Sequence, residues 1–346
     1  MKKLSVLGFV ATLAAPVQAA SITDPFTSFW VLGDSLSDNG NAAAMFEAVA
    51  GFPAPAGPLQ QPGVSSDGFT WVEDFNDAFD EAGKANANLS FGGALARDDG
   101  TSVPDLAAQI DAGTEFEATF NIGIPVTQTV DKYPDGQGGL MAREPQWGDT
   151  PLVTVFIGGN DYLAAANAAF AGDFSLLPTL VQDTLGVVQT QIDALVNAGV
   201  NDFVVMTLPD FEQIPLFNGP GAGLGAQLGG SAALYNEQLQ SYLAGLSANV
   251  TVVDVFSALS DDDLLAPLNL IDTENACVAA GVSDCSGYLY YDNIHPTKKG
   301  HDLIAKLTRE GLRETYELQP VPLPAPALML ITAITGLTLV RRRRPL

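Results

Sequence analysis

Short apolar runs alternate with helix-like stretches through most of this chain, and this alternation limits the folds open to it more than any other feature. Residues 179–198 carry apolar side chains at spacings of three and four and end before Gly199, as an amphipathic helix does. A strand-like run lies on each side of this stretch, which predicts parallel strands joined by a crossover helix. The runs that resemble buried strands are 28–32, 88–91, 151–157, 202–208 and 249–255.

Two more helices are predicted at residues 231–246 and 297–318, the second preceded by Pro296 and capped by a threonine. These elements together predict a three-layer α/β/α sandwich around a five-stranded parallel sheet. Open sheets of this kind bind ligands at the carboxyl ends of their strands. Residues 98–148 and the glycine-rich residues 217–230 do not fit the sheet, and we predict that both are excursions over the rim of that edge.

The block Gly33-Asp34-Ser35 comes directly after the first predicted strand, and residues 37–39 are of types that cap helices. A serine at this point would lie beside a helix amino terminus, where backbone N–H groups and the helix dipole stabilise a developing oxyanion. Glycine, aspartate and serine are also the usual residues of ordinary turns, so the block by itself leaves both interpretations open. Ser35 is the candidate nucleophile.

A serine hydroxyl needs a positioned base near neutral pH, most often a histidine oriented by a carboxylate. The chain has only two histidines. His295 lies in a loop-like stretch three residues after Asp292, close enough for one turn of chain to bring the carboxylate to the ring. His301 falls inside the last predicted helix, where a packing or solvent-facing role is expected. We therefore predict that His295 is the base and that Asp292 orients it.

An oxyanion hole needs donors beyond the N–H of the nucleophile itself. Gly92 and Gly93 follow the second predicted strand, and Asn160 comes after two glycines that follow the third. Both segments would lie at the same sheet edge as Ser35. Glycine admits close backbone approach and asparagine offers an amide donor, although glycines after strands are also common in turns.

Little in the chain points to a metal or a cofactor. Two histidines and two cysteines leave few ligands for a zinc site. The three aspartates at 261–263 lack the alternating ligands and the glycine of a calcium loop, so we predict a solvated turn there. We expect no cofactor.

The order Gly-Asp-Ser, Gly, Gly-x-Asn-Asp and Asp-x-x-His resembles the GDSL esterases and lipases, also called SGNH hydrolases. Residues 66–73 look like the Gly-x-x-Trp segment of that family, and 208–210 with Pro215 match as well. The Gly-x-Ser-x-Gly elbow of the α/β-hydrolases is absent. The bacterial phospholipase, lecithinase and hemolysin branch looks most similar. The resemblance covers nearly the whole chain after its first residues and implies the flavodoxin-like SGNH version of the predicted fold.

Carried over position by position, the resemblance implies a catalytic triad and a three-donor oxyanion hole. Gly93 is favoured over Gly92 for the hole, because the family glycine usually falls just before a small residue, here Ala94. The implied residues are Ser35, Asp292 and His295 for the triad, and Ser35, Gly93 and Asn160 for the hole.

The first residues resemble a secretory signal. Lys2 and Lys3 supply a basic start, residues 4–15 an apolar region, and residues 17–19 the small side chains before a cut near Ala20. An amphipathic first helix is the alternative, although the apolar run has no polar face. Export would place Cys277 and Cys285 in an oxidising compartment and favours a local disulfide over two free buried thiols.

The formal charge of the chain is −25, and it becomes −31 once six cations in the two ends, Lys2, Lys3 and residues 341–344, are removed. A surface this acidic repels nucleic acid and anionic membranes. We expect no nucleic-acid partner.

The carboxyl end forms a module of its own at residues 319–346, which leaves 1–19 as the signal and 20–318 as the catalytic domain. Val-Pro-Leu-Pro-Ala at 321–325 precedes an apolar run at 327–340, which is shorter than the roughly 20 residues of a spanning helix, and four arginines follow. The pattern resembles the VPLPA variant of the PEP-CTERM sorting tails. It implies membrane contact through the tail until a sorting protease cuts it, with a plain tail anchor as the alternative.

These patterns predict an exported serine esterase that works through an acyl-enzyme. The family branch makes acyl-lipid or phospholipid esters the first expectation for the substrate. Short-chain or carbohydrate acetyl esters are the second, and acyl transfer to a lipid acceptor is the third. A surface binding or adhesion protein with a vestigial site is the non-enzymatic alternative, and the filled catalytic positions argue against it.

Overall fold

The computed structural model describes residues 20–98, 103–110, 116–121, 125–130, 132–134, 140–142 and 148–318. The predicted signal at 1–19 and the predicted sorting module at 319–346 lie outside these residues, so both stay predictions. None of the helices in the described ranges combines the length and the apolar character needed to span a membrane.

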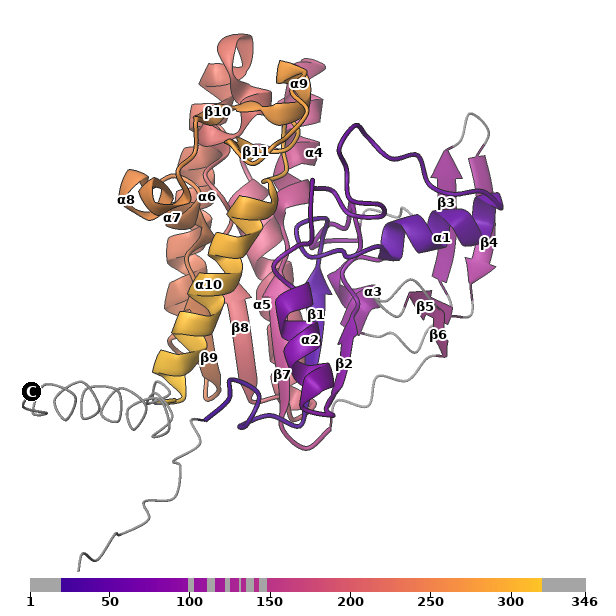
Figure 1. The fold of residues 1–346 in the computed structure, drawn as a ribbon, viewed down its shortest axis with the longest axis vertical. Coiled ribbons are helices and arrows are strands. Elements are labelled where there is room, and N and C mark those ends of the chain that lie inside the picture. Colours follow the sequence, from indigo (N-terminus) through magenta and orange to yellow (C-terminus); the bar gives the residue numbers. More distant parts are fainter. Residues whose placement is uncertain are drawn as a thin grey trace, which may run out of the picture.

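A parallel sheet of five strands forms the centre of the molecule, with the strand order β2-β1-β7-β8-β9 (Figure 1). All neighbouring strands in it run parallel. β1, β7 and β8 are buried along their whole length, which explains why their sequences are near-continuous apolar runs. The strands are β1 (Ser28–Gly33), β2 (Ala85–Asn88), β7 (Pro151–Phe156), β8 (Asp202–Met206) and β9 (Asn249–Val253). The predicted α/β fold is confirmed.

Helices cover both faces of the sheet. α2 and α10 pack on one face, and Figure 1 shows them in front of the strands, with α5 and α6 behind. Phe29 of β1 stacks on Phe79 of α2 with ring centroids 5.1 Å apart, so aromatic packing joins this layer to the sheet. The main helices are α1 (Asn41–Ala50), α2 (Glu73–Glu81), α3 (Leu106–Ile110), α4 (Gly159–Phe170), α5 (Leu180–Asn197), α6 (Ala222–Leu243) and α10 (Lys298–Thr315).

The second strand begins earlier than predicted, at Ala85 and not at Asn88. Its sequence, Ala-Asn-Ala-Asn, lies at the edge of the sheet with its first residue exposed, so it carries no apolar signal. The ladder nevertheless continues into the predicted segment, because the Leu89 and Phe91 N–H groups donate to carbonyls of β1 at 2.8 and 3.0 Å.

The prediction of a glycine-rich loop at 217–230 is wrong, because most of this stretch forms the start of α6. Its glycines allow close packing. A Cβ at Gly225 would lie 2.6 Å from Phe217 Cβ, and one at Gly229 would lie 2.5 Å from Asp210 Oδ1. The helix therefore tolerates glycine because neighbouring segments lie directly against it.

The excursion predicted at 98–148 contains α3 and two antiparallel strand pairs among its described residues, and Figure 1 shows these pairs beside α1. Their strands are β3 (Phe116–Asn121), β4 (Pro125–Val130), β5 (Lys132–Pro134) and β6 (Leu140–Ala142). The aspartates predicted as a solvated turn are exposed, and they start the short helix α8 (Asp262–Leu265), which Asp261 caps.

A second small sheet carries the segment that leads to His295. β10 (Asp272–Ala276) and β11 (Tyr288–Tyr290) pair in parallel, with α9 (Cys277–Ala280) between them. The remaining short elements are α7 (Val255–Ala258), η1 (Phe211–Gln213), η2 (Pro215–Phe217), η3 (Gly219–Gly221) and η4 (Ala266–Leu268).

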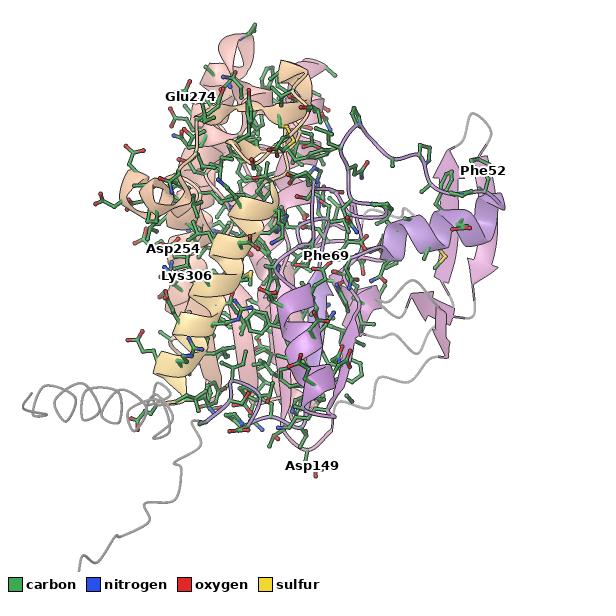
Figure 2. The ribbon with its side chains drawn as sticks, in the orientation of Figure 1. Phe52, Phe69, Asp149, Asp254, Glu274 and Lys306 are labelled. Carbon is green, nitrogen blue, oxygen red and sulfur yellow. A yellow bond between two sulfur atoms is a disulfide. The ribbon has the colours of Figure 1, made fainter. Side chains whose placement is uncertain are left out.

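Both described ends of the chain meet at the amino edge of the sheet. Tyr316, just after α10, packs edge-on against Phe26 with ring centroids 4.9 Å apart. Its hydroxyl donates to Asp202, the first residue of β8, at 2.7 Å. Figure 2 labels Asp149, just before β7, at this pole and Glu274 of β10 near the other.

Candidate active site

Ser35 stands in a tight turn directly after β1. The Ser37 and Asp38 N–H groups donate to the Asp34 carbonyl at 3.0 and 2.9 Å and close the turn. The Asp34 carboxylate accepts the Leu36 N–H at 3.0 Å, which fixes the turn from the side-chain end. Gly33 is required at the end of the strand, because a Cβ there would lie 2.7 Å from a carbonyl oxygen of β7. Ser35 is therefore held at the carboxyl edge of the sheet.

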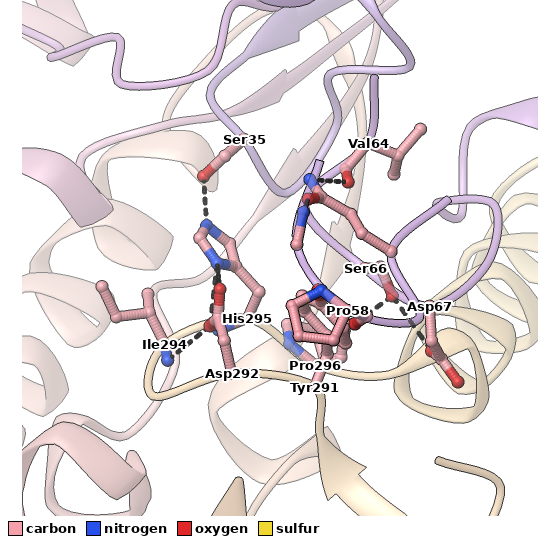
Figure 3. Close-up of polar contacts among 12 residues, drawn as sticks. Ser35, Pro58, Val64, Ser66, Asp67, Tyr291, Asp292, Ile294, His295 and Pro296 are labelled. Atoms are coloured by element: carbon pink, nitrogen blue, oxygen red, sulfur yellow. Dashed lines mark hydrogen bonds and ion pairs between the residues drawn. The ribbon is translucent and has the colours of Figure 1, made fainter. Parts of the chain in front are cut away.

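A chain of hydrogen bonds joins Ser35 to the other two predicted triad residues (Figure 3). Ser35 Oγ lies 2.8 Å from His295 Nε2. On the far side of the ring, His295 Nδ1 lies 2.8 Å from Asp292 Oδ2 and 3.0 Å from Oδ1. The structure thus brings together residues that are 260 positions apart in the sequence.

The surroundings of the Asp292 side chain favour its ionised form. Its Oδ1 also accepts the backbone N–H groups of Ile294 and His295 at 2.8 and 2.7 Å. Burial alone would raise the pKa of the Asp292 carboxyl, but the hydrogen bonds and charge of His295, with the Ile294 N–H, hold it below its ordinary value. An ionised carboxylate at Nδ1 leaves Nε2 as the nitrogen that can take a proton from Ser35.

His301 has no part in this arrangement. It lies on the buried face of α10 with 1% of its surface exposed, and burial lowers the pKa of its imidazole to about 3. Of the two roles considered for it, packing is the one that the structure supports.

The turn at Gly92 and Gly93 lies beside the nucleophile. The Ala94 N–H donates to the Phe91 carbonyl at 2.9 Å, and Gly93 has a φ of +88°, which favours glycine. A Cβ on Gly92 would approach the Ser35 Cβ to 4.0 Å. The Gly92 N–H is already donated to Asp38, whereas the Gly93 N–H donates to no described residue and is open to a ligand.

Asn160, which follows β7, lies beside the same turn. It stands in the first turn of α4, and its amide donates one hydrogen to the Ala94 carbonyl at 2.9 Å. An amide carries two N–H bonds, so the second is available to an oxyanion beside Ser35. The Asn160 amide is thereby tied to the turn that carries Gly93.

A cavity opens next to Ser35 on the side of β7 and β8, with about 440 Å³ of empty space, part of it open to solvent. Its walls are mostly apolar, and the polar side chains that line it are Asp34, Ser35 and Asn160. The apolar lining residues are Leu36, Leu163, Pro209, Phe211, Ile214, Leu259, Tyr290, Ile294 and Pro296. Such a surface suits an aliphatic group better than a polar one.

Two further buried carboxyls lie close to the nucleophile. Burial raises the pKa of Asp34 to about 7, against the Leu36 N–H, which lowers it. Burial also raises the pKa of Asp161 to about 6, against the Ala96 N–H and the charge of Arg97. Both residues belong to motifs singled out in the sequence, Gly-Asp-Ser and Gly-x-Asn-Asp, but nothing local shows that their side chains turn inward.

The structure joins Cys277 and Cys285 in a disulfide. It packs with Tyr291, the residue just before Asp292, in a small buried cluster. The Tyr291 hydroxyl donates to the Pro58 carbonyl at 2.9 Å, which ties the His295 loop to the loop before α2 (Figure 3). Among the described residues, no group of three or more His, Cys, Asp or Glu side chains is arranged to hold a metal ion.

Comparison with known proteins gives one family. The sequence profile of the family described as GDSL-like Lipase/Acylhydrolase matches residues 30–308. The phosphatidylcholine-sterol acyltransferase of Aeromonas hydrophila is 24% identical over 92% of this chain and 99% of that protein. Esterase EstA of Pseudomonas aeruginosa is 27% identical over 93% of this chain, which spans about half (52%) of EstA.

An acetylesterase of Thermothelomyces thermophilus is 23% identical over 88% of this chain and 94% of that protein. Among solved structures, the acetylxylan esterase Axe2 of Geobacillus stearothermophilus has a TM-score of 0.42 and 15% identity, over 83% of this chain and 94% of that one.

Proposed function

Because this chain belongs to the GDSL-like lipase and acylhydrolase family and is a carboxylic ester hydrolase, we propose that it works through an acyl-enzyme on Ser35. The single observation that carries the proposal is the continuous hydrogen-bond chain from Ser35 through His295 to Asp292. A serine, an imidazole and an ionised carboxylate in this order are the parts that nucleophilic acyl transfer requires.

In the proposed reaction, Ser35 Oγ attacks the ester carbonyl while His295 Nε2 takes its proton. The negative charge that develops on the carbonyl oxygen is met by the Ser35 and Gly93 N–H groups and the Asn160 amide. His295 then gives the proton to the leaving alcohol, and the ester bond to Ser35 remains. A water molecule activated by His295 hydrolyses that bond and releases the acid.

Labelling with a fluorophosphonate tests the assignment of the nucleophile. The wild-type protein should be labelled at Ser35, and Ser35→Ala should lose both the label and ester hydrolysis. Labelling of Ser35→Ala at another serine, with hydrolysis retained, would contradict the proposal.

For the substrate, we propose acyl-lipid or phospholipid esters first. The apolar cavity beside Ser35 supports an aliphatic acyl group, and the Aeromonas relative is named for an acyl transfer from phosphatidylcholine. Short-chain or carbohydrate acetyl esters are the second candidate, supported by the acetylesterase relative. Acyl transfer to a lipid acceptor is the third.

Hydrolysis rates across p-nitrophenyl esters of two to sixteen carbons, together with phosphatidylcholine vesicles, separate these candidates. A maximum at two carbons with no action on vesicles would overturn the lipid proposal. Loss of hydrolysis product in favour of a new ester, when a sterol or fatty alcohol is added, would favour transfer.

We propose that the enzyme is exported and that a sorting protease cuts its carboxyl module. The Cys277–Cys285 disulfide supports an oxidising compartment. Intact-mass analysis of protein from the native envelope should lack about residues 1–19 and the residues beyond 321–325. Recovery of the uncut carboxyl end would leave only the tail anchor.

A further inference from the structure

Two buried carboxylates hold the turn that carries Gly93 from opposite sides. We infer that Asp38 and Asp161 are positioning residues, which set the distance between the Gly93 and Asn160 donors and thereby the strength of the proposed oxyanion hole. The inference rests on the proposed function, since it assigns a role within that hole.

Asp38 holds one side of the turn. Its Oδ2 accepts the Gly92 N–H at 2.7 Å and the Ala42 N–H at 3.1 Å. Its Oδ1 accepts the N–H groups of Gly40 and Asn41 at 2.8 and 2.6 Å, at the amino end of α1. One carboxylate thus joins the nucleophile turn, the start of a helix and the residue before Gly93.

Asp161 holds the other side. Its side chain is fully buried, its Oδ2 accepts the Ala96 N–H at 2.7 Å, and its Oδ1 lies 3.2 Å from Arg97 Nε. The neighbouring Asn160 donates to the Ala94 carbonyl. The segment after Gly93 is therefore bound to the first turn of α4 at two successive points.

These contacts matter for the chemistry because no hydrogen bond between described residues holds the Gly93 N–H itself. Gly93 has a positive φ, no side chain, and no hydrogen bond from its own N–H among the described residues. The direction of that N–H is set by the anchored residues on each side of it. A displaced oxyanion donor loses stabilisation mainly in the transition state, where the charge on the oxygen is largest.

Asp38→Asn is the sharpest variant. An amide has one acceptor oxygen where the carboxylate has two, and each carboxylate oxygen receives two N–H groups. In one orientation the new NH₂ group faces the Gly92 and Ala42 N–H groups, and in the other it faces those of Gly40 and Asn41, so the variant loses one of these two pairs of bonds. Asp161→Ala removes the Ala96 acceptor, whereas Asp161→Asn keeps an oxygen for it and loses only the charge facing Arg97, so it should keep more of the activity than Asp161→Ala does.

We expect Asp38→Asn and Asp161→Ala to lower kcat by about 10- to 100-fold with KM changed less than about threefold, somewhat below the loss from deleting a donor outright. The rate should be divided by the number of sites that a fluorophosphonate titrates, so that misfolded protein does not count. Asp261→Asn is the matched control, since Asp261 caps α8 through the Asp263 N–H and its side chain is exposed.

Unchanged kcat per titrated site in both Asp38→Asn and Asp161→Ala would overturn the inference, as would a loss confined to KM. Hydrogen exchange of the Gly92 amide gives a second readout that needs no activity. The amide should be protected in the wild type and exchange faster in Asp38→Ala, which leaves no acceptor for it, and equal protection in both would also overturn the inference. A wild type with neither label nor hydrolysis would instead refute the proposed function.

Discussion

Replacing Asp34 by asparagine should stabilise the protein, and the gain should depend on pH. Asp34 has 2% of its surface exposed, and burial raises the pKa of its carboxyl from the ordinary 3.8 to about 7. A pKa difference of one corresponds to about 1.4 kcal/mol. The pKa difference of about 3 therefore means that ionising Asp34 costs about 4 kcal/mol more in the folded protein than in the unfolded chain. The nearby Asp161 carboxylate adds to this cost, and the charge of His295 reduces it.

The direction of this pH dependence follows from proton binding. Between pH 4 and pH 7 the folded protein keeps a proton on Asp34 that the unfolded chain has already released, so stability falls as the pH rises through this window. Asparagine has the shape of the protonated carboxyl and can still accept the Leu36 N–H, but it never ionises. Asp34→Asn should therefore match the wild type near pH 4 and exceed it by up to about 4 kcal/mol at pH 8.

Urea denaturation of both proteins at intervals from pH 4 to pH 8 measures this difference directly. The exposed Asp77 on α2 gives the control, because Asp77→Asn should show no such rise across the same range. A stability difference between Asp34→Asn and the wild type that stays constant with pH would refute the reasoning, and so would one that falls.

Other predictions concern the site and the disulfide. Ser35→Ala and His295→Ala should each lower kcat by about 10⁴-fold, while His301→Ala should keep most of its kcat and lose thermal stability. Steady-state kinetics that show a larger loss of kcat in His301→Ala than in His295→Ala would disprove the triad. Asn160→Ala should lower kcat by about 10²- to 10³-fold at nearly constant KM, and a loss in KM alone would indicate substrate positioning. Cys277→Ser should lower the free energy of unfolding by about 2–3 kcal/mol, and two titratable thiols in the native protein would exclude the bridge.

The sheet was predictable because its central strands are buried on both faces. β1, β7 and β8 are buried along their whole length and are therefore near-continuous apolar runs, which the sequence alone reveals. The edge strand β2 is half polar, since a strand at the edge of a sheet needs no continuous apolar run. The sequence therefore predicted its start three residues too late. The start of α6 was not predicted as a helix because it is rich in glycine. Glycine is common both in flexible loops and where a neighbouring segment packs closely against a helix.

The residues of the candidate triad were predictable for a chemical reason. The base beside a nucleophilic serine is usually a histidine, and this chain offers only two. Of these, only His295 has a carboxylate three residues before it. The contacts that anchor the turn at Gly93 were not predictable, because Asp38 looks like an ordinary helix-start residue and the motif that contains Asp161 does not show what its side chain binds. Their function depends on which distant N–H groups fold against them, and that is a property of the tertiary structure.

One consequence of α10 concerns handling the protein. The helix begins three residues after His295 and ends at Thr315, so its 18 residues span about 27 Å at about 1.5 Å each. Tyr316 then fastens the chain to the amino edge of the sheet. A bead, a dye or a surface coupled just after residue 318 would therefore lie at the amino edge of the sheet. The cavity, at the carboxyl edge, would still face the solution.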